Sequence, residues 1–361
     1  MMKILDRYIV NKFLAILFMA SMAFVVLFVV VDLIENLDRF LNSQATLVQG
    51  FLYYLYYIPQ IILLTLPVNM LLSSLFSLGS MSQYNELIAC MSAGVSLYRL
   101  VLPIMILAFF ISIGAGVFGE TLVPEANRAR LDIWRYEIRK EPRDQARNRS
   151  QLALQDYGNR QINISYYDGK RKMINKASIV EIRDNEVQQR WDVRKMIWEP
   201  DSSSWQMVGV IHRVLSDSGE QITEYDSLVY RNTRILPEDL QELQIQPEEM
   251  NYQELAAFVD NMRSIGVDAR KWLADLHMKI SYPFANFIIV LFGAPLASRK
   301  RRSGPAIGFA LALLISFVYF LFMRSGQVLG HKGALDPMVG AWIGNVIFGT
   351  GGLLMMMLMR K

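Results

Sequence analysis

Residues 13–31 read FLAILFMASMAFVVLFVVV, an apolar run without a single charge. A helix needs about 20 mostly apolar residues to cross a bilayer, because lipid offers no hydrogen-bond partner to exposed backbone groups. A short basic leader with Lys3, Arg7 and Lys12 precedes this run. A signal peptide would also begin in this way, but this run is longer than a signal core, and Asp32 stands where a small-residue cleavage site would follow. The sequence therefore predicts an uncleaved first membrane span.

Further apolar runs follow along the chain. They are residues 51–80, 100–123, 280–296, 306–323 and 338–359. Pro59 and Pro67 lie inside the first of these runs. Membrane helices tolerate proline where neighbouring groups satisfy the freed carbonyl, so we expect a kinked span there. The pattern predicts a polytopic α-helical membrane protein with six transmembrane helices, three before a long polar stretch and three after it.

The composition of the 361 residues agrees with this plan. Hydrophobic residues make up 53% and charged residues 19%, whereas an ordinary globular chain is about a quarter charged. These values exclude intrinsic disorder, a collagen-like chain and a disulfide-stapled secreted domain. The single cysteine, Cys90, cannot form an intramolecular disulfide, and three scattered histidines argue against a histidine-based metal site.

Lysine and arginine in the short loops set the orientation, since cytoplasmic loops carry an excess of these residues. The strongest basic run, residues 299–302, lies between predicted spans four and five, and the chain ends in Arg360-Lys361. The loop after the first span is acidic, with three carboxylates in residues 32–38. With six spans, the leader, the basic run and the C-terminus fall on one side. We therefore expect both termini in the cytoplasm and the polar middle in the periplasm of a Gram-negative cell.

The polar middle changes its pattern twice. Residues 125–145 favour a helix that continues the third span outward. Short alternating runs separated by turn formers follow over about residues 150–235, which is typical of a sandwich or barrel-like β domain. A helix resumes at Asn251 and ends near Gly266. The predicted domains are residues 1–124, 125–270 and 271–361.

The motifs of common catalytic and nucleotide-binding sites are absent. The chain has no GxxxxGK[ST], HExxH, GxSxG or CxxC pattern. No carboxylate or lysine lies in the middle of a span, which argues against a proton-coupled carrier. Arg324 and Lys279 lie at span ends, where snorkelling or a functional role would explain them. No convergent set of His, Asp or Glu lies at one membrane depth, so we expect no catalytic residue, no metal and no cofactor.

The loop between spans two and three, residues 81–94, reads MSQYNELIACMSAG. Ser82 or Asn85 can cap a short helix with Glu86 in its first turn, and Gly94 can end it. The sequence therefore predicts a short helix in this loop.

Leu87, Ile88 and Met91 fall on one face of this short helix. The residues leave two interpretations open. The first is a re-entrant connector that lies at the membrane interface. The second is a cytoplasmic docking helix on which Glu86 faces an arginine of a partner.

Four segments carry a resemblance to a known family. They are residues 5–9 (LDRYI), 85–94 (NELIACMSAG), 254–269 (EL followed by GVDA) and 279–283 (KISYP). In their order and spacing, they resemble the LptF/LptG (YjgP/YjgQ) family of lipopolysaccharide export permeases. The resemblance covers nearly the whole chain, and the opening Leu-Asp-Arg-Tyr favours the LptG branch.

The resemblance implies a fold and a set of partners. The β domain would be a periplasmic jellyroll, and the chain would be one subunit of an ABC-type exporter in the inner membrane. Its partners would be an LptF-like second permease, a dimeric LptB-like ATPase, a single-span LptC-like protein and an LptA-like periplasmic bridge. ATP would be used by the ATPase alone, so the permease would be no enzyme and would need no cofactor. Lipopolysaccharide would leave the outer leaflet of the inner membrane and pass along the jellyrolls; no nucleic acid is implied.

The resemblance also implies site residues. The segment near residues 83–94 would be a coupling helix that seats in a groove of the ATPase. Its contact residues would be Asn85, Glu86, Leu87, Met91 and Gly94.

A basic rim would contact the phosphates of lipid A, since phosphate favours charge-assisted contacts with arginine. At the exit of the first span the chain has Asp32 where LptG relatives can carry a lysine, so Arg39 is the cation of that loop. Arg128, Arg130 and Arg135 beyond span three are the alternative phosphate contacts, unless they form only a solvated basic face.

A second class of function stays open from the residues. The chain could be a non-transporting membrane sensor or scaffold whose periplasmic β domain binds an envelope partner. Crosslinking along spans one and five separates the two classes, because only a permease captures lipid there. A membrane-embedded enzyme is disfavoured by the missing catalytic constellation.

Overall fold

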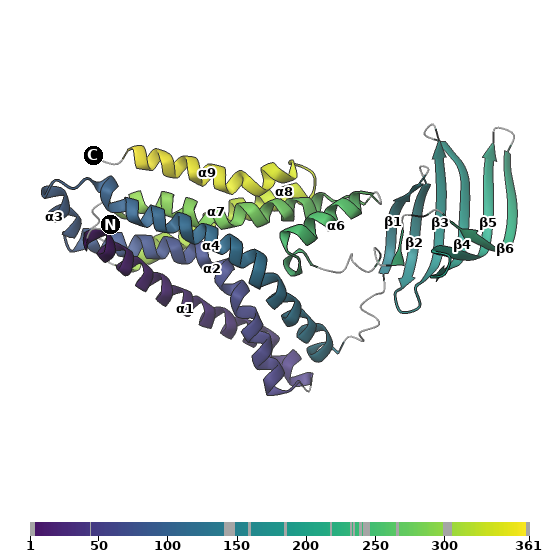
Figure 1. The fold of residues 1–361 in the computed structure, drawn as a ribbon, viewed down its shortest axis with the longest axis horizontal. Coiled ribbons are helices and arrows are strands. Elements are labelled where there is room, and N and C mark those ends of the chain that lie inside the picture. Colours follow the sequence, from purple (N-terminus) through teal and green to yellow (C-terminus); the bar gives the residue numbers. More distant parts are fainter. Residues whose placement is uncertain are drawn as a thin grey trace. The chain divides into compact units, whose positions relative to one another are not determined.

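The structure is a computed structural model. It describes residues 4–43, 45–140, 149–157, 160–183, 186–216, 219–231, 233, 235–237, 240, 246–264, 267–298 and 305–358. The basic run 299–302, Arg360-Lys361 and Gly266 lie outside the described residues. The chain divides into two compact units, one of long helices and one that contains the strands (Figure 1).

The described residues contain six helices that are long and apolar enough to cross a membrane, which confirms the three-plus-three plan. They are α1 (Ile4–Asn42), α2 (Leu47–Gln83), α4 (Leu97–Asp132), α7 (Arg270–Ser298), α8 (Pro305–His331) and α9 (Pro337–Met357). A short helix, α3 (Glu86–Ser92), lies between α2 and α4. Helix α4 passes into a π-helical segment, η1 (Ile133–Ile138), so the third span continues past the apolar run.

Helix α2 begins at a reciprocal cap. The Thr46 hydroxyl accepts a hydrogen bond from the Gln49 amide at 3.3 Å, and the Gln49 side chain accepts one from the Thr46 amide at 2.8 Å. Such a capping box satisfies two of the backbone N–H groups that the first turn leaves without intrahelical partners. Pro59 and Pro67 both lie inside α2, and the helix continues through them.

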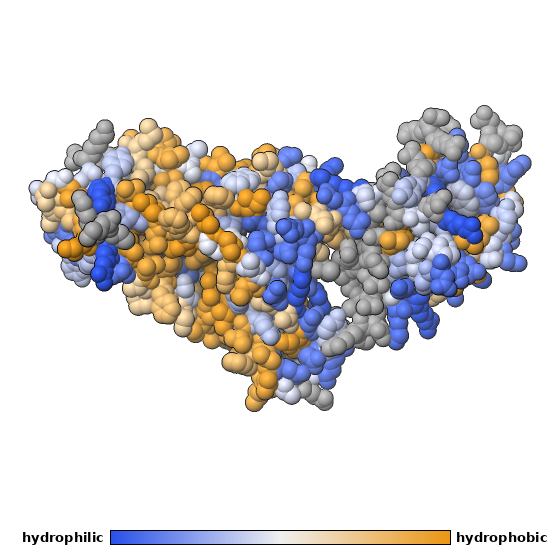
Figure 2. All heavy atoms as spheres, in the orientation of Figure 1, coloured by the Kyte–Doolittle hydropathy of each residue, from blue (hydrophilic) through white to orange (hydrophobic). Residues whose placement is uncertain are grey.

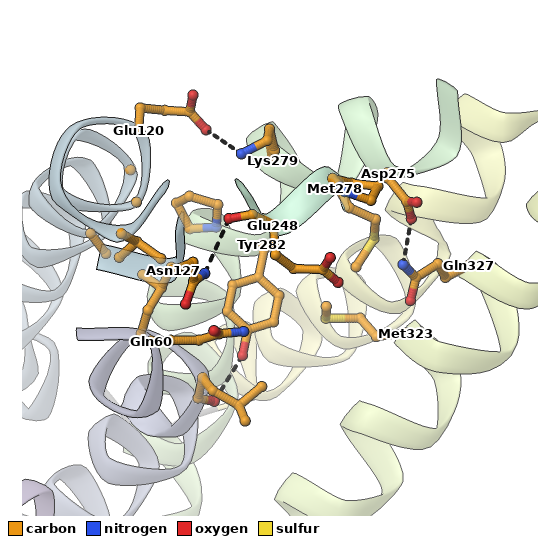
Figure 3. Close-up of a pocket in the computed structure, with 18 of the residues that line it drawn as sticks. Gln60, Glu120, Asn127, Glu248, Asp275, Met278, Lys279, Tyr282, Met323 and Gln327 are labelled. Carbon is orange, nitrogen blue, oxygen red and sulfur yellow. Dashed lines mark hydrogen bonds and ion pairs between the residues drawn. The ribbon is translucent and has the colours of Figure 1, made fainter. Parts of the chain in front are cut away.

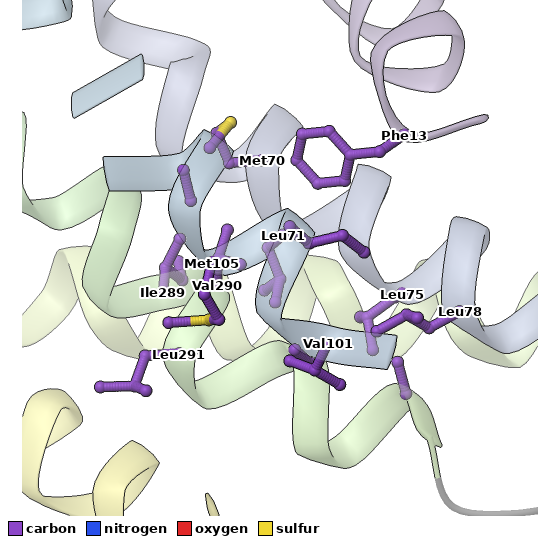
Figure 4. Close-up of a cluster of buried hydrophobic side chains, with 14 of the residues drawn as sticks. Phe13, Met70, Leu71, Leu75, Leu78, Val101, Met105, Ile289, Val290 and Leu291 are labelled. Carbon is purple, nitrogen blue, oxygen red and sulfur yellow. The ribbon is translucent and has the colours of Figure 1, made fainter. Parts of the chain in front are cut away.

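The core of the helical unit lies around α2, α4 and α7. Phe13 of α1 joins a buried cluster with Met70 and Leu71 of α2, Val101 of α4 and Ile289 of α7 (Figure 4). In its most apolar window α2 is 72% buried, whereas the corresponding window of α1 has no buried residue. Figure 2 shows the hydrophobic surface that results along the helical unit. Helix α2 is therefore central, and α1 presents apolar side chains outward along most of its length.

The second unit is built on one antiparallel sheet. Its strands are β1 (Arg149–Asp156), β2 (Arg160–Asp168), β3 (Met173–Arg183), β4 (Glu186–Glu199), β5 (Ser204–Ser216) and β6 (Gly219–Tyr230). Each strand pairs with the next in sequence, in the order β1 to β6 (Figure 1). The inserted β domain is thereby confirmed. The described strands follow each other as a meander, because each is joined to its neighbour by a short connection.

The core of the sheet contains two aromatic side chains with satisfied polar ends. Trp205 is 1% exposed and its indole N–H donates to the Ile235 carbonyl at 2.9 Å. Tyr230 of β6 donates its hydroxyl proton to the buried carboxylate of Asp156 on β1 at 2.8 Å. Burial, and next the Asp156 charge, raise the pKa of Tyr230 well above the usual tyrosine range. This bond joins the first and last strands of the sheet.

A short return segment leads back to the spans. It comprises a 3-10 turn, η4 (Pro247–Glu249), and helix α6 (Tyr252–Ser264). On α6 the side chains at the predicted helical spacing are buried. They are Leu255, Phe258, Val259 and Met262.

Candidate functional sites

The loop between α2 and α4 forms α3 and two backbone turns. Asn85 is the residue before α3 and has a left-handed backbone (φ +62°), and its side chain makes no capping hydrogen bond. Ser82, the other predicted cap, lies inside α2. Gly94 follows α3 with φ +83°, a conformation that glycine adopts without steric cost. Asn85 and Gly94 therefore shape the two turns that flank α3.

The side chains of α3 face two environments. Leu87 is 1% exposed and belongs to the core of the helical unit. Ile88 and Met91 are 37% and 42% exposed, and the neighbouring Tyr84 is 70% exposed. The three apolar residues predicted for one face thus divide: Leu87 anchors α3 to the spans, and Ile88 and Met91 form an outward apolar surface.

Glu86 contacts helix α1 of its own chain. The Tyr8 hydroxyl donates a hydrogen bond to its carboxylate at 3.0 Å, and the Lys12 ammonium lies 3.8 Å away. The Glu86 side chain keeps 33% of its surface exposed. Exposed ion pairs of this kind contribute about 0–1 kcal/mol, so a stronger cation from outside the chain can compete for this carboxylate.

Two more contacts gather separate segments at this end of the bundle. Arg99 of α4 donates two hydrogen bonds to the Asp6 carboxylate of α1, at 2.7 and 2.8 Å. The Tyr98 hydroxyl donates to the Met356 carbonyl at the end of α9 at 2.6 Å. The beginning of α1, the end of α9 and α3 therefore lie at one end of the helical unit, as Figure 1 shows.

An aromatic cluster lies where α1 ends, α2 begins and α4 ends. Tyr53 and Trp134 lie 5.5 Å apart between ring centres, and Phe40 packs against both. The guanidinium of Arg130 lies 4.2 Å from the centre of the Tyr57 ring and that of Arg39 lies 5.6 Å from Trp134. Both distances are in the range of a cation–π contact.

The four arginines predicted as phosphate contacts thus lie in three different environments. Arg39 and Arg130 share the aromatic cluster through Trp134 and Tyr53. Arg128 instead forms an ion pair with Glu254 and donates to the Glu249 carbonyl at 2.6 Å. Arg135 is part of η1 in the other unit.

Asp32, the residue that departs from the expected lysine, also lies at this cluster. It accepts a hydrogen bond from the Tyr54 hydroxyl at 3.1 Å. The carboxylate therefore joins the end of α1 to the start of α2. Because Asp32 is hydrogen-bonded to the Tyr54 hydroxyl, the cations of the cluster are Arg39 and Arg130.

Sequence reasoning missed several residues of these sites. Tyr8 and Asp6 belong to the opening segment that carries the family resemblance, but nothing in that segment names Glu86 or Arg99 as their partners. The tyrosines that begin α2 carry a readable signal, since Tyr and Trp are enriched at membrane–water interfaces. These tyrosines are Tyr53, Tyr54, Tyr56 and Tyr57.

Comparison with known proteins assigns the chain to a family. The sequence model of the lipopolysaccharide export system permease LptF/LptG matches residues 7–360. The chain belongs to the LptF/LptG family. The curated proteins it resembles include LptF of Escherichia coli, 23% identical over 81% of this chain and 77% of that protein. They also include LptG of Escherichia coli, 22% identical over 99% of this chain and 98% of its relative, and LptG of Haemophilus influenzae, 21% identical over 96% of both.

These LptF/LptG relatives bear both branch names at nearly equal identity. The LptG proteins align over more of the chain than LptF does. Assignment to the LptG branch stays a prediction, because identities of 22% and 23% do not separate the two. The family, the six spans and the inserted β domain agree with one another.

Proposed function

We propose that this chain is a permease subunit, of the LptG branch, in an ATP-driven lipopolysaccharide exporter of the inner membrane. The observation that carries this proposal is the family match over residues 7–360, together with the six spans. The lipid would be drawn from the outer leaflet, and the β domain would pass it to a periplasmic bridge. The second permease, the LptC-like protein and the ATPase dimer belong to the same proposal.

The outward surface of α3 supports a docking role. Ile88, Met91 and Tyr84 expose apolar surface, and Glu86 offers a partly exposed carboxylate beside them. Leu87 and the two flanking turns fix α3 to the spans. A push on α3 would therefore reach the core of the spans through the buried side chain of Leu87. We assign this surface to the ATPase, and this end of the bundle to the cytoplasm.

Arg39 and Arg130 support a phosphate contact. They lie near the C-terminal ends of α1 and α4, away from the end that carries α3. Their guanidinium groups lie against aromatic rings that order them before any ligand arrives. Arginine held in this way matches phosphate through paired N–H donors. Arg128 takes a structural part instead, because Glu254 already neutralises it.

Reconstitution tests the proposal. The chain with its co-purified subunits in proteoliposomes should release lipopolysaccharide to an acceptor only with ATP. Release that is equally fast with a hydrolysis-dead ATPase would contradict transport. Lipid crosslinked along α1 and α8 supports the permease, whereas protein crosslinks confined to the β domain would support a sensor or scaffold.

A pair of variants tests the role of Glu86. Glu86→Ala should keep the complex assembled while ATP hydrolysis no longer drives release. Tyr8→Phe removes only hydrogen bonds within the chain, those with Glu86 and Lys12, and should leave coupling within about fivefold of wild type, since a net hydrogen bond stabilises by roughly 1 kcal/mol. If both variants lost ATP-driven release equally, Glu86 would act through its contact with α1, and the docking role would be contradicted.

A further inference from the structure

A cavity of about 530 Å³ lies within the helical unit, between α2, α4, α7, α8 and η4 (Figure 3). This volume is in the range of about 300–1,000 Å³ that small-molecule sites occupy. Its lining is mostly apolar and includes Leu63, Leu64, Met278, Phe320 and Met323. Leu64 is 43% exposed, so the cavity wall reaches the apolar surface of the spans. An apolar ligand can therefore reach the cavity from the bilayer.

Two buried acceptors in this cavity have no hydrogen-bond partner among the described residues. Asn127 is 1% exposed; its amide nitrogen donates to the Glu248 carbonyl at 3.1 Å, and its Oδ1 is unpartnered. The Oε1 of Gln60 is likewise buried and unpartnered. Figure 3 shows both side chains at the same part of the cavity, close to the ring of Tyr282. A buried acceptor left without a donor costs about 1–3 kcal/mol, so these two oxygens call for a donor from a ligand.

The charges around the cavity select the kind of head group. The lining carries three carboxylates and two cations, which are Glu120, Glu248, Asp275, Lys279 and Arg324. Lys279 pairs with Glu120 at 3.3 Å, and Asp275 accepts from Gln327 at 2.7 Å and from His331 at 2.8 Å if that ring nitrogen is protonated. The lining therefore carries a slight negative charge, which repels a phosphate.

We propose that this cavity binds one neutral, hydroxyl-bearing amphiphile from the bilayer, with the chemistry of a monoacylglycerol. Its hydroxyl groups donate to Asn127 Oδ1 and Gln60 Oε1, and its chain lies against Leu64, Met278 and Phe320. The site is formed within one chain, and it is separate from the aromatic cluster that carries Arg39 and Arg130. The inference goes beyond lipopolysaccharide export and does not depend on it.

A photolabelling experiment tests this site with the full chain and its co-purified subunits in lipid nanodiscs. The probe is a monoacylglycerol with a diazirine in its chain, and crosslinks are mapped by mass spectrometry. Saturable labelling of α7 near Met278 and of α8 near Phe320 is expected. Excess unlabelled monoacylglycerol should remove it, and an alkyl phosphate of equal chain length should compete at least tenfold less well.

Matched glycine variants on α4 locate the site. A Cβ at Gly116 would lie 3.5 Å from Pro283 at the cavity wall, so Gly116→Leu should fill the cavity and reduce labelling at least fivefold. Gly114 is exposed on the same helix with nothing within 4 Å, so Gly114→Leu should label like wild type. Gln60→Met nearly keeps the side-chain volume but removes an acceptor. It should raise the probe concentration needed for half-maximal labelling about fivefold.

Several outcomes would overturn the proposal. Labelling that is not saturable, or that falls on α1 and the outer face of α8 as strongly as on the cavity, shows that the cavity is not a specific site for this lipid. If the alkyl phosphate competes as well as unlabelled monoacylglycerol, the proposed selectivity for a neutral head group is contradicted. If the Gly116→Leu variant does not assemble, the Gln60→Met variant tests the site alone. A half-maximal labelling concentration equal to that of wild type in Gln60→Met would contradict the site.

Discussion

Arg130 and Arg128 are two residues apart on α4, yet their guanidinium groups are held in different ways. Arg130 lies on the Tyr57 ring, and its buried Nε has no hydrogen-bond partner in the described part of the chain. Arg128 is paired with Glu254 and with the Glu249 carbonyl. The charge of Arg130 is therefore the one available to an anionic ligand.

Replacing each arginine in turn separates these roles. We expect Arg130→Gln to weaken lipopolysaccharide binding about three- to tenfold and to reduce its salt dependence, because a charge-assisted contact to phosphate is lost. Arg128→Gln should bind the lipid like wild type and lower the melting temperature instead. Binding to the detergent-solubilised complex, titrated at two salt concentrations, measures both. Equal weakening by the two variants would contradict the division.

Tyr230 gives the β unit a pH dependence. Its pKa is raised by burial and by the Asp156 carboxylate, so the folded state holds the phenol proton more tightly than the unfolded state. The stability from this group is fully present below the ordinary tyrosine pKa of about 10 and is lost as pH rises above it.

Tyr230→Phe tests this linkage. At neutral pH the variant should be less stable by about 1.5–3 kcal/mol, because the buried Asp156 carboxyl group loses the hydrogen bond from the Tyr230 hydroxyl. The difference from wild type should narrow above pH 10. Pulse proteolysis within the strands, in urea at pH 7 to 11, follows both proteins. A difference that stays constant over this range would show that the phenol proton is not linked to folding.

At the level of secondary-structure elements, α8 and α9 pack closely where glycines face each other. A Cβ added at Gly340 would lie 2.5 Å from the Gly326 carbonyl oxygen, and one added at Gly326 would lie 2.3 Å from the Gly340 oxygen. No Cβ fits at such distances, and small residues are what lets membrane helices approach closely. The two helices therefore depend on glycine at both positions.

An alanine pair on α9 measures this packing. Gly340→Ala should force α8 and α9 apart and cost about 1–3 kcal/mol, the usual range for an overfilled core. Gly349→Ala is the control, because a Cβ there would meet only Ile288 at 4.0 Å. Thermal melting in detergent compares the two. A loss in Gly349→Ala as large as that in Gly340→Ala would contradict the glycine contact.

The spans and the β domain could be predicted because their signals are local. Hydropathy over about 20 residues marks a span, and alternation between turn formers marks a strand. The bond from Tyr8 to Glu86 joins residues 78 apart, and the contact from Arg99 to Asp6 joins residues 93 apart. No local pattern encodes such partners. For the same reason Arg128 and Arg130 looked equivalent in the sequence.

The orientation of the whole molecule can be tested with its single thiol. Cys90 lies on α3 and is partly exposed. We expect a membrane-impermeant maleimide to label it in inside-out vesicles and not in right-side-out ones, because the excess of Lys and Arg in the short loops predicts that α3 is cytoplasmic. In a Cys90→Ser background, Asp201→Cys at an exposed turn of the β unit should show the opposite pattern. Labelling of Cys90 from the outside would reverse the topology.

The pairing of Asp6 with Arg99 has a consequence for biosynthesis. The side chain of Asp6 is only 11% exposed, and its partner Arg99 is synthesised 93 residues later. At about 5–20 residues per second, the ribosome needs roughly 5 to 20 s to supply it. During that interval α1 lacks its contact with α4, so the packing of the first span is completed only when the third span has been synthesised.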